Sequence, residues 1–396
     1  MTGLTRTRVS DARGAGRMLL DASVGVVDVV ERMHRTIQRR PGPLGEPIAE
    51  ATRGITGFVY RSIRGTMQLA ARGLDASLAP LERLLPDAAT TPGRDVYLSI
   101  VNGVYGDHLA RTGNPLAIEM RLLHDGVTLD ASSPASHFAC AGRPAPTGKL
   151  LVFVHGLCMS VQQWSNEGYS HGAALADAFG YTPLYLRYNS GLHVADNGRL
   201  FAELLEALLA GWPCGVDELT IVGHSMGGLV ARSACLAGGE HGHRWPAQLR
   251  TLVFLGTPHH GAPLERGGHG LDYLLDLSPY SAPFTRLGRA RSAGIRDLRH
   301  GTITSGPHRV VPLPSGVNCY AVAASLGARA NMLADHVIGD GLVPLNSALG
   351  RHADPKRSLQ LPRAHTWVGY QMGHLELLHR PEVYAQLRSW LATPAA

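Results

Sequence analysis

The chain has 396 residues, of which 44% are hydrophobic and 17% charged, and this composition excludes an intrinsically disordered protein. The length is enough for one large domain with an appendage, or for two domains. The formal charge of +6 is modest for this length and no run of five or six basic residues occurs, so we do not expect binding to nucleic acid.

The five cysteines lie far apart and include no CxxC pair, which argues against both a disulfide framework and a zinc ribbon. An apolar stretch from Met18 to Val30 resembles a signal peptide, but Asp21 and Asp28 interrupt it and no cleavage site of small residues follows. No window is apolar for long enough to span a membrane. We therefore expect a cytoplasmic protein without a metal or a cofactor.

Residues 1–90 are predicted to form a helical extension, separate from a domain over residues 91–396. Helices are expected over Met18–Ile37 and over Ala49–Ala79. On an ideal helix, the second places its arginines on one arc and its apolar residues on another, as a basic amphipathic helix does. Its apolar stripe is expected either to pack on the downstream domain or a second copy, or to adsorb to an anionic membrane or lipid particle.

Between the extension and residue 149 the sequence predicts only a few elements. A linker is expected over Thr90–Gly93 and a helix over Val96–Ala110. A His-Asp-Gly turn lies between two apolar runs, Leu116–Leu123 and Val127–Leu129, and predicts a hairpin. The Pro-, Gly- and Ala-rich segment Pro134–Gly148 is predicted to be a loop.

From residue 149 onward, short apolar runs alternate with helical patterns. Strands are predicted over Leu150–Val154, Pro183–Tyr188, Leu219–Val222, Leu249–Leu255 and Val317–Ala323, with a shorter run around Thr366–Val368. Helices are predicted over Gly198–Ala210, Met226–Ala237 and Pro381–Leu391. Fully apolar strands separated by helices indicate a parallel sheet covered on both faces, so the fold class is α/β and doubly wound.

The sequence Gly223-His-Ser-Met-Gly227 follows the predicted strand Leu219–Val222 and opens a predicted helix. A GxSxG pattern alone is a weak signal, but a strand, a turn of small residues and a helix in this order predict a nucleophile elbow with Ser225 as the nucleophile. His224 is interpreted as a neighbour of the turn and not as a base. The helix N-terminus would present backbone N–H groups and a positive dipole to a developing oxyanion.

A serine nucleophile needs a histidine base and an orienting carboxylate, and after such an elbow the acid precedes the histidine. Asp340 is the predicted acid because it lies in a tight, glycine-flanked loop after the last long predicted strand. Asp335 is its rival, five residues earlier.

His374 is the predicted base because Gly373 leaves room for a loop that presents it at the edge of the sheet. Its nearest competitors are His365 and His379. For the oxyanion hole, the predicted donors are the backbone N–H groups of Leu157, in the loop after an earlier strand, and of Met226.

These residues resemble the α/β-hydrolase superfamily, and more closely its bacterial lipases and PGAP1-like esterases. The motifs that carry the resemblance are His155-Gly156, Gly-His-Ser-Met-Gly-Gly at 223–228, Gly-Thr-Pro-His-His-Gly at 256–261, Asp340-Gly-Leu-Val and Gly373-His374-Leu. The resemblance implies a triad of Ser225, His374 and Asp340 that hydrolyses carboxylic esters through an acyl-enzyme. It also implies that the segment of about 261–316 forms a cap or lid, whose apolar residues either line an acyl-binding wall or bury the insertion's own core.

The leading hypothesis is therefore a serine hydrolase of an ester or lipid-like small molecule with an apolar acyl group. One alternative is acyl transfer or thioester hydrolysis by the same triad. Another is a lipid-surface protein that acts mainly through its N-terminal helices. Neither an export signal nor a carboxylate cluster for calcium is recognisable, so an intracellular esterase, in peripheral contact with a membrane at most, fits better than a secreted lipase.

Overall fold

The computed structural model describes residues 10–11, 13–21, 61–63, 65–67, 69, 73, 92–140, 143–262, 292–306, 310–328 and 339–392. The chain divides into two compact units, Met1–Thr90 with Leu109–Ala117, and Thr91–His108 with Ile118–Ala396. In the first unit residues 13–21 are helical, as are 61–63 and 65–67. The rest of the two predicted N-terminal helices, and residues 263–291 of the predicted cap, lie outside the described residues.

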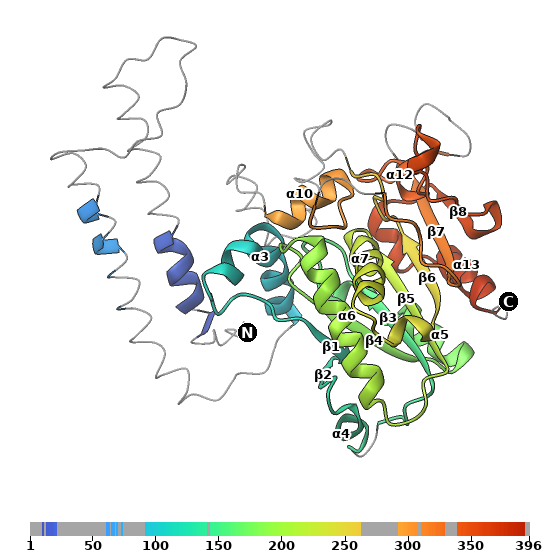
Figure 1. The fold of residues 1–396 in the computed structure, drawn as a ribbon, viewed down its shortest axis with the longest axis horizontal. Helices are drawn as coiled ribbons and strands as arrows, with labels where there is room; N and C mark the ends of the chain where they lie inside the picture. The colour runs from blue at the N-terminus through green and yellow to red at the C-terminus, as the bar shows by residue number, and fades with distance from the viewer. Residues whose placement is uncertain are drawn as a thin grey trace, which may run out of the picture. The chain divides into compact units, whose positions relative to one another are not determined.

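The described part of the second unit contains one sheet with the strand order β2-β1-β4-β3-β5-β6-β7-β8 (Figure 1). The strands are β1 (Arg121–His124), β2 (Val127–Leu129), β3 (Lys149–Val154), β4 (Thr182–Arg187), β5 (Glu218–His224), β6 (Leu249–Leu255), β7 (Asn318–Ser325) and β8 (Thr366–Tyr370). β1 pairs antiparallel with both β2 and β4, and all the other pairings are parallel. The sheet is therefore mostly parallel, as the apolar strands predict.

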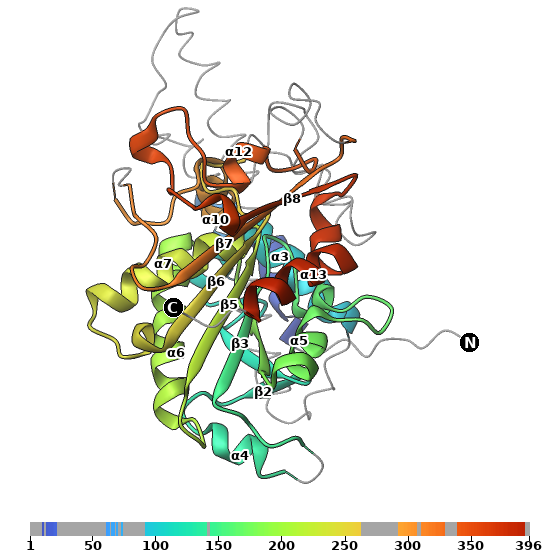
Figure 2. The ribbon, with the colours of Figure 1, turned by 90° about the vertical axis from the view of Figure 1, so that its right-hand side faces the viewer.

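Helices cover both faces of this sheet. They are α3 (Pro92–Arg111), α4 (Pro134–Phe138), α5 (His171–Phe179), α6 (Val194–Gly211), α7 (Met226–Glu240), α10 (Ala293–His300), α12 (Leu345–Ala348) and α13 (Pro381–Leu391). Figure 2 shows α6 and α7 on one side of the sheet and α5 and α13 on the other. None of the helices in the described part combines the length and hydropathy that a bilayer crossing requires.

The alternation of side chains along β3 divides the core into two clusters. Leu150, Val152 and Val154 face the cluster that contains residues of α6 and α7. Leu151 and Phe153 face the cluster that contains residues of α5 and α13. All five side chains are fully buried, which explains why the strand is apolar throughout.

Three predictions upstream of β3 are wrong in their bounds. α3 begins at Pro92, inside the predicted linker, because proline fits the first turn of a helix. β1 begins only at Arg121, and the preceding backbone is held differently, with the Ile118 N–H donating to the side-chain oxygen of Asn102 at 2.9 Å. The predicted loop Pro134–Gly148 opens with the short helix α4, again with proline in its first turn.

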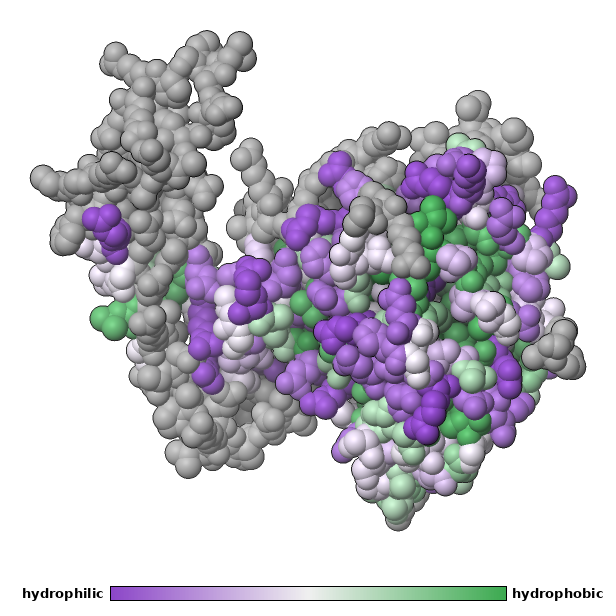
Figure 3. All heavy atoms as spheres, viewed as in Figure 1, coloured by the Kyte–Doolittle hydropathy of each residue, from purple (hydrophilic) through white to green (hydrophobic). Residues whose placement is uncertain are grey.

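The surface of the described part is mostly polar on the face shown in Figure 3, with apolar residues in small groups between charged ones. Among the described residues of the second unit, the exposed large hydrophobic side chains are those of Val127, Val310 and Leu326. Single exposed apolar residues are ordinary on a protein surface, so each needs a further observation before it supports a role.

Two buried histidines make stability depend on pH. Burial lowers the pKa of His155 and of His171 to about 4, against an ordinary value of 6.5. Between those pH values the unfolded chain binds protons that the folded chain rejects, so the free energy of unfolding should fall as the pH drops from 6.5 toward 4. Each histidine contributes up to about 1.4 kcal/mol per pH unit.

Urea denaturation at pH 7, 6 and 5 measures this dependence. His171 contacts the Tyr169 hydroxyl at 2.9 Å and the Leu377 carbonyl at 3.2 Å, so His171→Gln retains hydrogen-bonding capacity without a titrating group. This variant should show a shallower fall in the free energy of unfolding than the wild type. If the free energy of unfolding stayed constant or increased as the pH dropped from 6.5 to 5, the assignment of neutral, buried imidazoles would be wrong.

Candidate active site

Ser225 occupies a sharp turn between β5 and α7. Its φ of 53° and ψ of −124° are unusual for a residue other than glycine, and its backbone N–H still donates to the Leu255 carbonyl of β6 at 2.8 Å. A side chain at Gly223 would place its Cβ 2.6 Å from the Gly228 backbone, and one at Gly227 would place it 2.1 Å from the Val154 carbonyl oxygen. The flanking glycines are therefore required by the close packing of the turn.

Asp340 and His374 form a buried pair. His374 Nδ1 lies 2.6 Å from Asp340 Oδ2, and both side chains are almost fully buried. The other carboxylate oxygen, Oδ1, accepts the backbone N–H groups of Leu342 at 3.0 Å and Val343 at 2.8 Å. The Asp340 carbonyl also accepts the His374 N–H at 3.2 Å. This arrangement orients the imidazole ring. Nδ1 carries the proton and donates it in a hydrogen bond to the carboxylate, which leaves Nε2 as an acceptor.

Ser225 lies beside this pair. A Cβ on Gly156 would lie 3.0 Å from Ser225 Cβ and 3.3 Å from His224 Nδ1, and the rings of His224 and His374 are 4.6 Å apart. Among the described residues no hydrogen bond joins Ser225 to His374, and His374 Nε2 has no partner. Catalytic hydrogen bonds of this kind often shorten only when substrate binds, so the open Nε2 is compatible with a role as base.

The sheet brings the three residues to one edge. Ser225 follows β5, Asp340 lies in the loop region between β7 and β8, and His374 follows β8. β5, β6, β7 and β8 are parallel neighbours, so their carboxyl ends share one edge. Gly256, which follows β6, borders His374, since a Cβ there would lie 3.0 Å from His374 Cε1.

The predicted oxyanion donors also lie near Ser225. Leu157 is next to Gly156, and within the described residues no hydrogen bond takes up its backbone N–H. Met226 is the first residue of α7, where an N–H has no acceptor within the helix. Both N–H groups are therefore left without a backbone acceptor among the described residues, and their role as oxyanion donors stays a prediction.

The rival residues occupy other positions. His365 contacts the Cys319 carbonyl at 3.1 Å and packs against Tyr320, and His379 ends a short 3-10 helix, His374–Leu378. Asp335 lies outside the described residues. Neither described histidine has a contact with Asp340.

His224 has a role in the site that the sequence interpretation missed. Its Nε2 lies 3.1 Å from the His374 carbonyl oxygen, and burial, with a further contribution from His374, lowers its pKa well below the ordinary value. A neutral His224 therefore donates to the main chain of His374. The position of His224 next to the serine was the only signal in the sequence for this contact.

Gly156 gives a test of the geometry around Ser225. Gly156→Ala should place a methyl group 3.0 Å from Ser225 Cβ and 2.9 Å from Met159 Sδ, so we expect Met159, Ser225 and the loop that carries the Leu157 N–H to adjust. Because removal of one oxyanion donor typically costs 10²–10³ in rate, we expect kcat to fall at least about tenfold. Ester hydrolysis rates of the purified variant measure this, and the melting temperature serves as the control for folding. An unchanged kcat would place the oxyanion hole elsewhere.

Comparisons with known proteins find one family model and several solved structures. Residues 200–308 match the family described as PGAP1-like alpha/beta domain. No curated protein matches the sequence. Among solved structures, the Bacillus licheniformis lipase BlEst2 in mature form is 20% identical, covers 65% of this chain and 97% of its own, and has a TM-score of 0.43. A metagenomic carboxyl esterase, MGS0156, is 20% identical, with 75% and 87% covered and a TM-score of 0.37.

A Pyrococcus furiosus esterase is 16% identical, with 63% of this chain and 84% of its own covered and a TM-score of 0.40. The mostly parallel sheet, and the serine in the sharp turn between β5 and α7, are features of the α/β-hydrolase fold. The chain has the α/β-hydrolase fold, and over residues 200–308 it is similar to the PGAP1-like alpha/beta domain family.

Proposed function

We propose that this protein is a serine hydrolase of carboxylic esters, with Ser225 as nucleophile, His374 as base and Asp340 as the orienting acid. The observation that carries the proposal is the buried 2.6 Å contact between His374 and Asp340, beside a serine held at the N-terminus of α7. Nothing in the reaction needs a cofactor. The lipase and esterase names of the neighbouring structures agree with the proposal but do not carry it.

In the proposed reaction Ser225 Oγ attacks the acyl carbon while its proton moves to His374 Nε2. The carbonyl oxygen becomes an oxyanion that accepts the N–H groups of Leu157 and Met226. When the tetrahedral intermediate collapses, His374 gives the proton to the leaving alkoxide, and the alcohol departs from an acyl-enzyme. Water then attacks the acyl-enzyme while His374 takes its proton. When this second tetrahedral intermediate collapses, the carboxylic acid is released and His374 returns the proton to Ser225 Oγ. Asp340 stays ionised throughout and stabilises the imidazolium.

An exposed leucine supports an apolar acyl group in the substrate. Leu326 is 52% exposed, yet it lies beside the loops of both catalytic partners. A Cβ on Gly341, next to Asp340, would lie 3.5 Å from its Cδ1, and a Cβ on Gly373, next to His374, would lie 3.7 Å from its Cδ2. An acyl chain in contact with Leu326 would bury this surface, which favours longer apolar esters over short ones.

Covalent labelling tests the proposed function directly. A fluorophosphonate probe should modify the wild-type protein at Ser225, as peptide mass spectrometry can show. Ser225→Ala should lose the label, whereas Ser136→Ala, which removes an exposed hydroxyl on α4, should keep it. Labelling that persists in Ser225→Ala, or that falls on another serine, would reject the assignment.

A further inference from the structure

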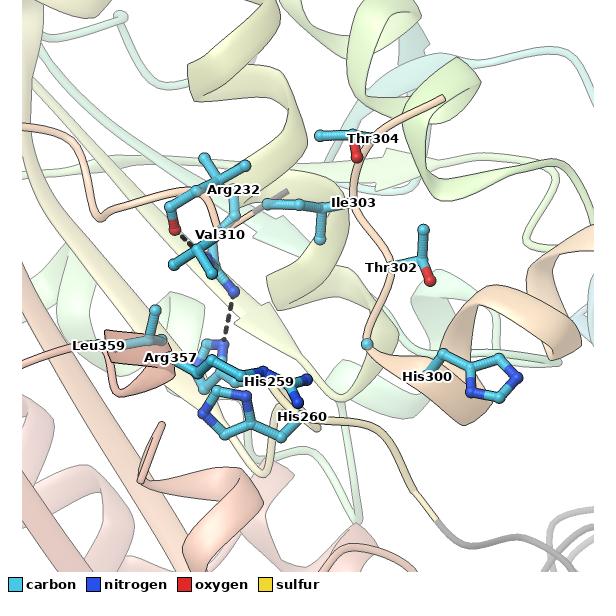
Figure 4. Close-up of a pocket in the computed structure, with 12 residues that line it drawn as sticks. Arg232, His259, His260, His300, Thr302, Ile303, Thr304, Val310, Arg357 and Leu359 are labelled. Atoms are coloured by element: carbon cyan, nitrogen blue, oxygen red, sulfur yellow. Dashed lines mark hydrogen bonds between the residues drawn. The ribbon is translucent and has the colours of Figure 1, made fainter. Parts of the chain in front are cut away.

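A cavity whose described lining residues include none of the proposed triad is shown in Figure 4. Its volume is about 410 Å³, and its walls come from α7, from the loop after β6, from the chain after α10 and from the short 3-10 helix Pro355–Arg357. Polar groups enter it from each wall: Arg232, His259, His260, Thr302 and Arg357 all line it. No acidic residue is among its described lining residues.

Arg232 is a buried cation, and no described residue provides it with an anionic partner. It is only 6% exposed, its Nη2 donates to the Val311 carbonyl at 2.7 Å, and its Nη1 lies 3.4 Å from His259 Nδ1. Its Nε has no hydrogen-bond partner among the described residues. Figure 4 shows the guanidinium extending from α7 toward His259.

The groups around Arg232 do not neutralise it. Burial lowers its pKa to about 10, so the guanidinium is charged at neutral pH. The titratable groups that favour its charge are the thiols of Cys235 and Cys319, and burial raises the pKa of each to about 12, so both are uncharged. An unpaired buried charge is costly, and such groups in folded proteins usually have a counter-ion.

The neighbouring histidines hold further buried polar atoms that have no partner among the described residues. Because Arg232 Nη1 donates to His259 Nδ1, the proton of a neutral His259 lies on Nε2, and this atom is buried without a partner. Nε2 of His260 is also buried without a partner. Burial, together with the charge of Arg232, lowers the pKa of both imidazoles, as expected in a positive field that no anion offsets.

Further positively charged residues lie at the protein surface near this cavity. Arg357 is exposed and forms no ion pair with the described residues, and the carboxylate of the nearby Asp354 accepts the Lys356 N–H. An adjoining cavity shares His260, adds Arg351 and His352, and likewise has no acid among its described lining residues. The electrostatics therefore favour an anionic ligand at this position.

We propose that the cavity lined by Arg232, His259, His260 and Arg357 binds a tetrahedral oxyanion of the phosphate class, either free phosphate or a phosphate monoester. The donors approach from separate walls, which suits an anion with acceptor oxygens in several directions better than a planar carboxylate. The volume of the cavity leaves room for a small substituent on the phosphate. The site does not depend on Ser225 and can be tested without measuring hydrolysis.

The test is a comparison of anions by titration calorimetry and thermal unfolding of the full-length protein, at fixed pH and matched ionic strength. Sodium phosphate should bind and raise the melting temperature relative to sodium chloride. Arg232→Met should weaken binding about tenfold or more, because it removes charge-assisted hydrogen bonds. Arg250→Met, which removes an exposed arginine on β6, should bind phosphate as the wild type does.

Arg357→Ala is a second test of the site, in case Arg232→Met fails to fold. Arg357 is exposed, so its replacement should not disturb folding, and it too should weaken phosphate binding. Without phosphate, Arg232→Met should melt at the wild-type temperature or above it, since the unpaired charge is gone. A titration with glycerol 3-phosphate distinguishes the two candidate ligands. If it binds at least as tightly as phosphate, the ligand is a phosphate monoester; if it binds more weakly, the ligand is free phosphate. The proposal is overturned if phosphate has no effect beyond chloride, or if acetate binds equally well.

Discussion

Ser225→Ala is expected to lower kcat/KM for p-nitrophenyl acyl esters by roughly 10⁵-fold or more, because no other group can form the acyl-enzyme. The residual rate should come from the oxyanion donors and from substrate binding alone. Steady-state hydrolysis assays on purified protein measure the loss. KM should change little, since the hydroxyl contributes to the reaction more than to substrate binding.

Folding of the Ser225→Ala variant should be intact. Alanine keeps the Cβ that packs against Gly156, and no hydrogen bond of the described residues uses the Ser225 hydroxyl. Ser225→Gly should be more stable by about 1 kcal/mol, because glycine accepts a φ of 53° without strain. Both variants should be inactive. Hydrolysis by either at a rate near that of the wild type or of Ser136→Ala would show that the nucleophile is another residue.

The sequence predicted the local parts of the fold best. β6 and α13 have the bounds that were predicted, because every residue of β6 except the exposed Arg250 is buried and Pro381 marks the first turn of α13. α5 was missed because its nine residues make too few turns to show a helical period, although Ser170 caps it. β1 was predicted too long because apolar residues from Leu116 onward are also buried outside the strand.

The site was predictable to the extent that one stretch of chain encodes it. The turn at Ser225 is formed by residues that are adjacent in the sequence, and its flanking glycines predict it. The contact between Asp340 and His374 joins residues 34 positions apart and depends on β7 lying beside β8, which no local pattern reveals. It was inferred from chain order and loop composition. The contact from His224 to the His374 carbonyl, across 150 positions, had no signal of its own.

The burial of Arg232 could not be predicted from the sequence of its helix. On α7 it looks like the polar residue of an amphipathic pattern, which would normally face solvent. It is buried because the chain around Val311 and the loop at His259 close over it. Only the tertiary contacts reveal the unpaired charge. The predicted basic helix of Ala49–Ala79 and its affinity for lipid surfaces stay predictions, because most of that segment lies outside the described residues.

Asp340→Asn should lower kcat by about 10⁴-fold, because it moves the proton of His374 from Nδ1 to Nε2. Asp340 Oδ1 already accepts two backbone N–H groups, from Leu342 and Val343, so the carbonyl oxygen of the asparagine must take that position. The amide NH₂ then faces His374 Nδ1 as a donor. The imidazole can satisfy it only by carrying its own proton on Nε2, and in that tautomer it cannot accept the proton of Ser225.

The same geometry separates this effect from a loss of structure. Asparagine is the same size as aspartate and keeps the contacts to the loop backbone, so the melting temperature of Asp340→Asn should stay close to that of the wild type. The matched control is Asp354→Asn, which alters the exposed cap of a 3-10 helix and should leave kcat unchanged. Fluorophosphonate labelling of Ser225 should slow in parallel with kcat, because it needs the same proton transfer. If Asp340→Asn retained a tenth of the wild-type kcat, another carboxylate would have to orient His374.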